Sequence, residues 1–307
     1  MAIVMNEVNC LWDARARLGE GVFWHPGEAC VYWVDILKST LHRLATDGAR
    51  RSWHFPGALS AVAPCAAGGL LATFRDGLYH LDMDVAAATP LLQLESDLPG
   101  NRFNDGALDT RGAFWFGSMD EKEQAQTGHF YRLSGEGELE RLDHLGRFCI
   151  TNGPAFSLDG NRVYFTDTLG RRIYRAPLDA QGRPGSPEIF VVFGDNDGHP
   201  DGMCTDIEGG VWVSHFGAGR VTRFSADGCV DRVLTVPAPN VTKCALGGPD
   251  YATLYITTAC KGLNDEQLAQ FPLSGALFAV TTESRGAPTV LFDLAPLRRR
   301  LPGLVIE

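Results

Sequence analysis

Three side chains that carry oxygen ligands stand next to glycine or proline, where the backbone of this 307-residue chain can approach a small ion closely. Glu20 has a glycine on each side, Asn152 precedes a Gly-Pro pair, and Asp201 lies between proline and glycine. Ligation by oxygen alone suits hard divalent cations better than a structural zinc site. We therefore predict one divalent ion held by Glu20, Asn152 and Asp201, with Asn104 as a fourth oxygen. Each residue taken singly could instead cap a turn.

The spacing of these residues along the chain supports a shared location. Six polar residues stand 11 or 12 positions before six large apolar residues that recur along the chain. The polar residues are Glu20, Ser60, Asn104, Asn152, Asp201 and Lys243, and the apolar ones are Tyr32, Leu71, Trp115, Tyr164, Trp212 and Tyr255. Equal offsets in equivalent repeats place side chains at equivalent positions, so we expect them to converge at the mouth of a central channel.

The repeats that would position this site are turns rich in Gly, Asp and Pro, each followed by short strands with aromatic or β-branched residues. The apolar positions follow one another at intervals of 39, 44, 49, 48 and 43 residues, and a second alternating strand follows each of them. A period near 45 residues matches a four-stranded propeller blade. The pattern predicts an all-β, six-bladed β-propeller in one domain, residues 1–307, with a pair of β-sandwiches as the alternative.

A ring of blades must join its first and last members. We expect the segment 8–12 to pair into the sixth blade beside the segment 289–293, which would cover two strand edges that otherwise invite aggregation. One helix is predicted, over residues 264–270, as a loop decoration.

Composition excludes several classes of partner. The formal net charge of −10 disfavours nucleic acid and an anionic membrane surface. No apolar run reaches the length of a membrane span, and the first twelve residues do not resemble a signal peptide. Eight scattered cysteines without a CxxC pair predict reduced thiols in a cytoplasmic protein. We expect a monomer or a weak homo-oligomer.

Motifs of other enzyme classes are absent. The chain has no GxSxG, GxGxxG, P-loop or HExxH, which removes serine hydrolase, dinucleotide, nucleoside triphosphate and zinc-protease interpretations. Among the histidines, His199 is expected to line the pocket because it lies two residues before Asp201.

Four segments together resemble the signature stretches of the SMP-30/gluconolactonase/regucalcin-like family, in the same order over nearly the whole chain. They are Leu18-Gly19-Glu20-Gly21, Asn101-Arg102-Phe103-Asn104-Asp105-Gly106, Thr151-Asn152-Gly153-Pro154 and Pro200-Asp201-Gly202-Met203. The segments 240–243 and 247–250 are similar to bacterial sugar lactonases in particular.

The resemblance implies a six-bladed propeller with a metal held by Glu20, Asn152 and Asp201, and sugar-binding roles for Arg102 and Asn104. In some members an acidic residue after the third-blade strand contacts substrate. Ungapped spacing places that position on a lysine, residue 122, with an acidic residue on either side. We expect Glu121 to take the role.

These residues predict hydrolysis of a sugar-acid lactone to the open aldonic acid. Ca²⁺, Mg²⁺, Mn²⁺, Zn²⁺ or Fe²⁺ would activate the carbonyl or a water, with Asp201 as general base. Lys243 would stabilise oxyanion charge, or instead form a salt bridge to a ligating carboxylate. A promiscuous metal-dependent esterase or organophosphate hydrolase and a non-catalytic calcium-binding propeller stay open as alternatives, while a strictosidine-synthase-like condensation ranks last.

Overall fold

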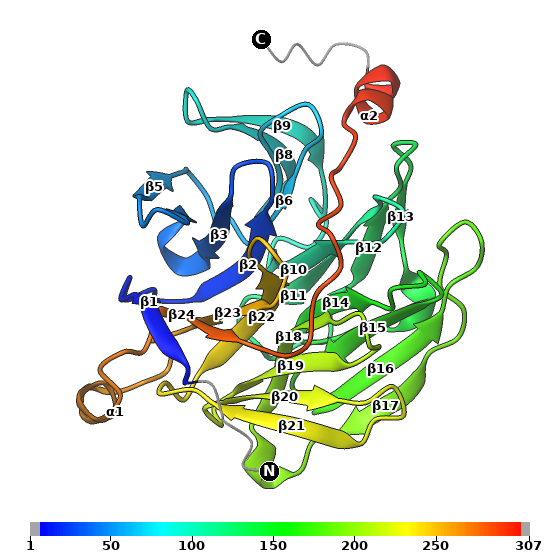
Figure 1. The fold of residues 1–307 in the computed structure, drawn as a ribbon. Coiled ribbons are helices and arrows are strands. Elements are labelled where there is room, and N and C mark those ends of the chain that lie inside the picture. Colours follow the sequence, from blue (N-terminus) through cyan, green and yellow to red (C-terminus); the bar gives the residue numbers. More distant parts are fainter. Residues whose placement is uncertain (1–6, 302–307) are drawn as a thin grey trace.

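Each of the six predicted repeats forms a four-stranded antiparallel sheet, and the six sheets stand in a ring around a central channel (Figure 1). The computed structural model describes residues 7–301. From the channel outward, blade 1 comprises β2 (Gly19–His25), β3 (Cys30–Asp35), β4 (Thr40–Ala45) and β5 (Arg50–His54). Blade 2 comprises β6 (Ala61–Pro64), β7 (Leu70–Phe74), β8 (Gly77–Asp82) and β9 (Ala87–Gln93). Blade 3 comprises β10 (Asn101–Leu108), β11 (Phe114–Asp120), β12 (Phe130–Leu133) and β13 (Leu139–Arg141).

Blades 4 to 6 follow in the same order from the channel outward. Blade 4 comprises β14 (Thr151–Phe156), β15 (Arg162–Asp167), β16 (Arg172–Pro177) and β17 (Glu188–Val192). Blade 5 comprises β18 (His199–Thr205), β19 (Val211–Phe216), β20 (Arg220–Phe224) and β21 (Val230–Thr235). Blade 6 comprises β22 (Val241–Gly247), β23 (Thr253–Thr258), β24 (Leu277–Thr281) and β1 (Asn9–Trp12). All six repeating apolar residues lie in the second strand of their blade, which confirms the predicted fold.

The core lies between the faces of neighbouring blades. Large rings such as Trp33, Trp115 and Trp212 on second strands are fully buried there, whereas the outermost strands β5, β17 and β21 are largely exposed. Burial of apolar side chains on second strands therefore explains why the aromatic and β-branched residues recur once per blade.

A buried aspartate organises the turn that leads into the second strand in two of the blades. In blade 5, Asp206 accepts hydrogen bonds from the amide of Gly210 (2.8 Å), from Nε1 of Trp212 (2.8 Å) and from Nε of Arg223 (2.6 Å). Asp109 repeats the arrangement in blade 3, where it accepts from the indole six residues later. These bonds tie a tight turn to the large ring that anchors the blade.

The N-terminal strand closes the ring, as predicted, but its partner differs from the prediction. β1 pairs antiparallel with β24, with Asn9 opposite Ala279 and Cys10 opposite Phe278. The segment 289–293 does not flank β1, so that part of the prediction is wrong. The sixth blade contains its own third strand at 277–281, which supplies the edge that β1 needs.

The segment 282–294 instead crosses one end of the channel, where Figure 1 shows it running over the blades toward α2 (Ala295–Arg300). Thr289 donates to the carbonyl of Trp24 in blade 1 (2.9 Å). Phe292 donates to the carbonyl of Pro64 in blade 2 (2.8 Å), and its own carbonyl accepts from the amide of Ala66 (2.9 Å). The segment therefore links blade 6 to blades 1 and 2, and it buries Phe292 and Leu294 without forming a blade strand.

The helices are short. α1 (Asp265–Gln270) confirms the predicted helix, and Asn264 caps it by accepting from the amide of Gln267 (2.9 Å). α2 was not predicted; a proline in its first turn favours its start, and three arginines follow in its last turn. Among residues 7–301, no helix is both long enough and apolar enough to cross a membrane.

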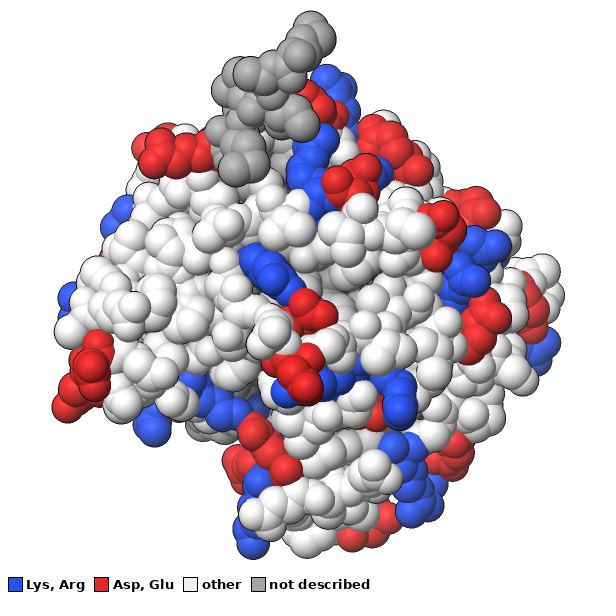
Figure 2. All heavy atoms as spheres, turned by 90° about the horizontal axis from the view of Figure 1, so that it is seen from below, with Lys and Arg blue, Asp and Glu red and all other residues white. Residues whose placement is uncertain are grey.

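The surface and the thiols agree with the composition. On the face shown in Figure 2, groups of Lys and Arg are interspersed with Asp and Glu, and no part of that face is uniformly basic. All eight cysteines are free.

We expect Asp206→Ala to lower the free energy of unfolding by about 3–5 kcal/mol, because it leaves buried donors of Arg223 and Trp212 without an acceptor. Denaturant unfolding followed by tryptophan fluorescence measures the change. Asp231→Ala is the matched control, since Asp231 binds the same arginine (2.7 Å) but is largely exposed. The control should lose no more than about 1 kcal/mol. Equal losses in the two variants would contradict the structural role of Asp206.

Candidate functional site

The innermost strands carry the predicted side chains, and irregularities in their pairing with the second strands direct these side chains toward the channel. The register between first and second strands shifts directly after Glu20 in blade 1, Asn152 in blade 4 and Pro200 in blade 5, and similar shifts occur in blades 3 and 6. A β-bulge bends a strand and re-aims its side chains. Gly21 and Gly153 have φ values of 59° and 76°, which explains the glycines beside the polar residues.

Most of the predicted residues line one cavity of about 180 Å³, which we call the polar cavity. Its predicted members are Glu20, Arg102, Asn104, Asn152 and Asp201. His199 also lines it, as expected. The other lining residues are Leu18, Met119, Glu123, Ile150, Thr168, Leu169, Phe216 and Lys261.

A chain of hydrogen bonds crosses three blades within this cavity. Nη1 of Arg102 donates to Oδ1 of Asn104 (2.8 Å), and Nδ2 of Asn104 donates to Oδ1 of Asn152 (2.9 Å). Nδ2 of Asn152 then donates to Oγ1 of Thr168 (2.8 Å), which donates to the carbonyl of Pro200 (3.0 Å). The chain holds the amide of Asn152 in one orientation, next to the backbone that carries Asp201. Asn104 fixes this orientation through its amide group, and its own oxygen, which accepts one bond from Arg102, also keeps a second lone pair.

Glu20 and Asp201 are buried carboxylates, and neither forms a salt bridge with a Lys, Arg or His side chain of the described residues. Burial, with further repulsion from Asp105, raises the pKa of Glu20 to about 8. Burial and repulsion from Glu20 raise the pKa of Asp201 well above its ordinary value. Oδ1 of Asp201 is buried and has no hydrogen-bond partner among the described residues. A cation beside these oxygens would relieve both the repulsion and the unpaired acceptor.

The donor set fits a divalent cation that prefers oxygen. Within the described part of the chain, no three or more His, Cys, Asp or Glu side chains gather to hold a metal, so the set needs the amide oxygen of Asn152. That oxygen accepts one bond, from Asn104, and keeps a second lone pair. The residues present could thus hold an ion with two carboxylates and one amide oxygen.

Lys243 lies outside the polar cavity. Its ammonium donates to a carboxylate oxygen of Asp105 and to the carbonyl of Gly106 (3.3 Å). Burial opposes the charge of Lys243, but the carboxylates of Asp105 and Glu20 outweigh it, so the pKa of Lys243 is raised. Of the two roles predicted for Lys243, the structure therefore shows the salt bridge. Its partner is Asp105, which was not among the predicted metal ligands.

Asp105 is a charged residue beside the site that the sequence analysis did not assign a role. It is buried, and besides Lys243 it accepts from the amides of Gly106 (2.7 Å) and Gly153 (3.1 Å). Strand alternation points consecutive residues to opposite faces. The register shift between Phe103 and Gly106 breaks this alternation, so Asp105 and Asn104 both reach the channel. The Asp-Gly pair after Asn104 was the available signal.

Glu121 does not line the polar cavity. It is about half exposed and forms an ion pair with Arg75. Glu123, two residues later, lines the cavity and pairs with Lys261. Spacing along the chain fell on residue 122, between the two glutamates, and the turn that follows β11 brings Glu123 to the cavity while Glu121, the residue expected to contact substrate, lies outside it.

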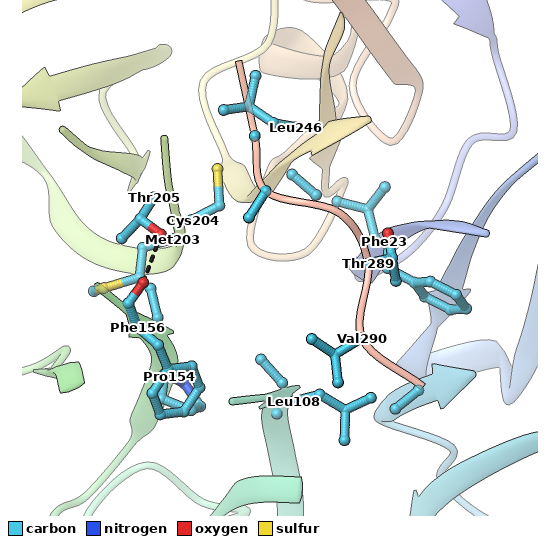
Figure 3. A pocket seen from close by; sticks show the side chains of 18 of the residues that line it. Phe23, Leu108, Pro154, Phe156, Met203, Cys204, Thr205, Leu246, Thr289 and Val290 are labelled. Carbon is cyan, nitrogen blue, oxygen red and sulfur yellow. Dashed lines mark hydrogen bonds between the residues drawn. The ribbon is translucent and has the colours of Figure 1, made fainter. Parts of the chain in front are cut away.

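A second cavity, of about 210 Å³, lies beneath the segment 286–290 (Figure 3). Side chains such as Phe23, Leu108, Phe156, Met203 and Val290 surround it and make it mostly apolar. Lys243 lines this apolar cavity and is the one member of the predicted site to do so. The chemistry of the polar cavity therefore makes it the candidate active site.

Comparisons of the whole chain with known proteins give a family match, similar sequences and a similar solved structure. The family model described as the SMP-30/Gluconolactonase/LRE-like region matches residues 18–260. A 6-deoxy-6-sulfogluconolactonase of Pseudomonas putida is 35% identical over 94% of this chain and 99% of its own. An L-arabinolactonase of Azospirillum brasilense is 35% identical over 95% and 97%. The crystal structure of a calcium-binding protein, regucalcin, from Agrobacterium tumefaciens is 33% identical, with a TM-score of 0.89 over 94% of this chain and 98% of that one.

We expect Glu20→Gln to change stability in opposite directions without and with a divalent ion. The pKa of Glu20 in the fold, about 8, exceeds that of the unfolded chain, so its ionisation destabilises the metal-free fold as pH rises toward 8. At pH 8 in chelator, the variant should therefore melt at or above the wild-type temperature. With the ion added, the wild type should gain stability and the variant should gain much less.

Scanning calorimetry in both buffers measures these shifts, with exposed Glu208→Gln as control. An equal metal-induced gain in Glu20→Gln and the wild type would remove Glu20 from the ligand set.

Lys243→Met should lower the free energy of unfolding by about 3–5 kcal/mol, because it leaves Asp105 buried without its cation. Adding Asp105→Asn should restore part of that loss, and denaturant unfolding of the two single variants and the double variant measures the coupling. Additive losses would show that the two side chains do not act as a pair.

Proposed function

Because the chain belongs to the SMP-30/gluconolactonase/LRE-like family, we propose that it is a lactonase that opens the ring ester of a sugar acid with the help of one divalent ion. The observation that carries the proposal is the pair of buried carboxylates, Glu20 and Asp201, with Oδ1 of Asp201 unpartnered in the polar cavity. The names of the similar proteins, a sulfogluconolactonase and an arabinolactonase, support the same class of substrate.

Glu20, Asn152 and Asp201 would hold the ion, which when bound supplies a Lewis acid for the lactone carbonyl and lowers the pKa of water. Asp201 accepts the proton of the attacking water through the carboxylate oxygen that the ion does not occupy. Water adds to the carbonyl carbon, the ring C–O bond breaks, and the released alkoxide takes up the proton held by Asp201 to give the hydroxy acid. No other co-reactant is needed.

Arg102 orients the substrate in this scheme. Its Nη1 is engaged with Asn104 and with the carbonyl of Phe103 (2.9 Å), while within residues 7–301 its Nε and Nη2 have no acceptor. These donors are available for sugar hydroxyls, and a fixed fork of donors gives orientation as well as affinity. Lys243 remains paired with Asp105, next to the polar cavity and outside it.

A non-catalytic calcium-binding propeller is the second candidate, favoured by the description of the similar Agrobacterium protein as calcium-binding. Such a protein would bind the ion without accelerating ring opening. The proposal also includes a cytoplasmic location, supported by the eight free cysteines.

The decisive assay follows acid release from xylono-, arabinono-, galactono- and gluconolactone after chelation, with each divalent metal added back. We expect metal-dependent acceleration on one or two of these lactones, above spontaneous opening. Asp201→Asn should lose about 10²–10⁴-fold in turnover and keep its fold, because it lacks the base. Asp195→Asn, an exposed residue of the same blade, is the control and should retain wild-type turnover. Metal binding without acceleration of any lactone would favour the binding protein.

A further inference from the structure

An ion pair spans the polar cavity between opposite blades. Lys261 follows β23 of blade 6, Glu123 follows β11 of blade 3, and their charged groups are in direct contact. Both residues line the cavity, and each side chain is about one third exposed (34% and 33%). This pair is therefore in contact with both solvent and the polar cavity.

The backbone on each side of the pair is held firmly. The amide of Lys261 donates to the carbonyl of Arg17 (2.9 Å), and its carbonyl accepts from Nδ2 of Asn240 (2.8 Å). The turn that carries Glu123 is closed by Asp120, whose Oδ2 accepts from the amides of residues 124 (2.9 Å) and 125 (2.8 Å). The two side chains can consequently exchange partners while their attachment points stay in place.

Glu123 also acts on the buried guanidinium of Arg102. Burial lowers the pKa of Arg102, and the carboxylates of Glu121 and Glu123 oppose that effect. Since Nε and Nη2 of Arg102 have no acceptor among residues 7–301, the carboxylate of Glu123 is near two cations and directly bonded to only one of them, Lys261. An acidic group of a ligand could replace it there at little loss, because partly exposed ion pairs are weak.

From these contacts we propose that the substrate carries an anionic group in addition to its lactone ring, and that Lys261 binds this group after exchanging it for Glu123. The inference rests on the proposed function and narrows its substrate class to lactones of acidic sugars, with a carboxylate or sulfonate away from the ring ester. Lys261 is then a specificity-determining residue, and Glu123 holds it in the absence of substrate.

The test compares galactono-1,4-lactone with galactaro-1,4-lactone, in which a carboxylate replaces the terminal hydroxymethyl group. The measured quantity is the ratio of kcat/KM for the anionic lactone to that for the neutral one. We expect a ratio above 1 in the wild type, a fall of about tenfold or more in Lys261→Met through KM, and rescue by Lys261→Arg. Glu123→Gln should raise the ratio, because the internal competitor is lost.

Arg75→Met is the matched control, since Arg75 forms a similar ion pair with Glu121 outside the cavity, and it should leave the ratio unchanged. Gluconolactone and 6-deoxy-6-sulfogluconolactone, as a second substrate pair, distinguish a sulfonate from a carboxylate. A purely structural ion pair would shift the ratio in the same direction in Lys261→Met and Glu123→Gln, and that result would overturn the inference. A wild-type ratio at or below 1 for both substrate pairs, with the neutral lactones opened, would overturn it while leaving the lactonase intact. Opening of neither lactone would defeat both proposals.

Discussion

Three carboxylates, Glu20, Asp105 and Asp201, are buried beside the channel axis, and Lys243 directly binds only Asp105. Burying like charges together is strongly unfavourable unless they are paired or neutralised. The ion pair of Asp105 and Lys243 connects opposite blades and divides the channel into a polar and an apolar cavity. The charge left on Glu20 and Asp201 makes the polar side a site that attracts a cation.

The rest of the site is an arrangement for keeping these groups in place. Register shifts in the innermost strands let neighbouring residues face the axis, and glycines with positive φ make the shifts possible. Gly202 also leaves room for the stem of Lys243, because a Cβ there would lie 2.6 Å from its Cγ. The hydrogen-bond chain from Arg102 to Pro200 then joins three blades into one rigid wall.

Periodic features of this protein were predictable from its sequence, and irregular ones were not. The six apolar anchors and the convergence of Glu20, Asn152 and Asp201 followed from equal spacing, which symmetry converts into equal position. Asp105 was missed because a bulge overrides strand alternation. Glu121 was chosen over Glu123 because a turn, in which each residue points differently, has no period to extrapolate. The path of residues 289–293 depends on which surface remains uncovered once every blade is complete.

The pairing of β1 with β24 joins residues about 270 positions apart in the chain. A ribosome releases the first of these strands long before the last, so the sixth sheet is completed only when synthesis is nearly finished. Until then β1 has no strand to pair with, and the first five blades form a ring that is not yet closed. The segment 282–294, made later still, fastens blade 6 to blades 1 and 2. Assembly of the charged axis is therefore a late event, and a chain cut short by some thirty residues would present exposed strand edges to its neighbours instead of a closed ring.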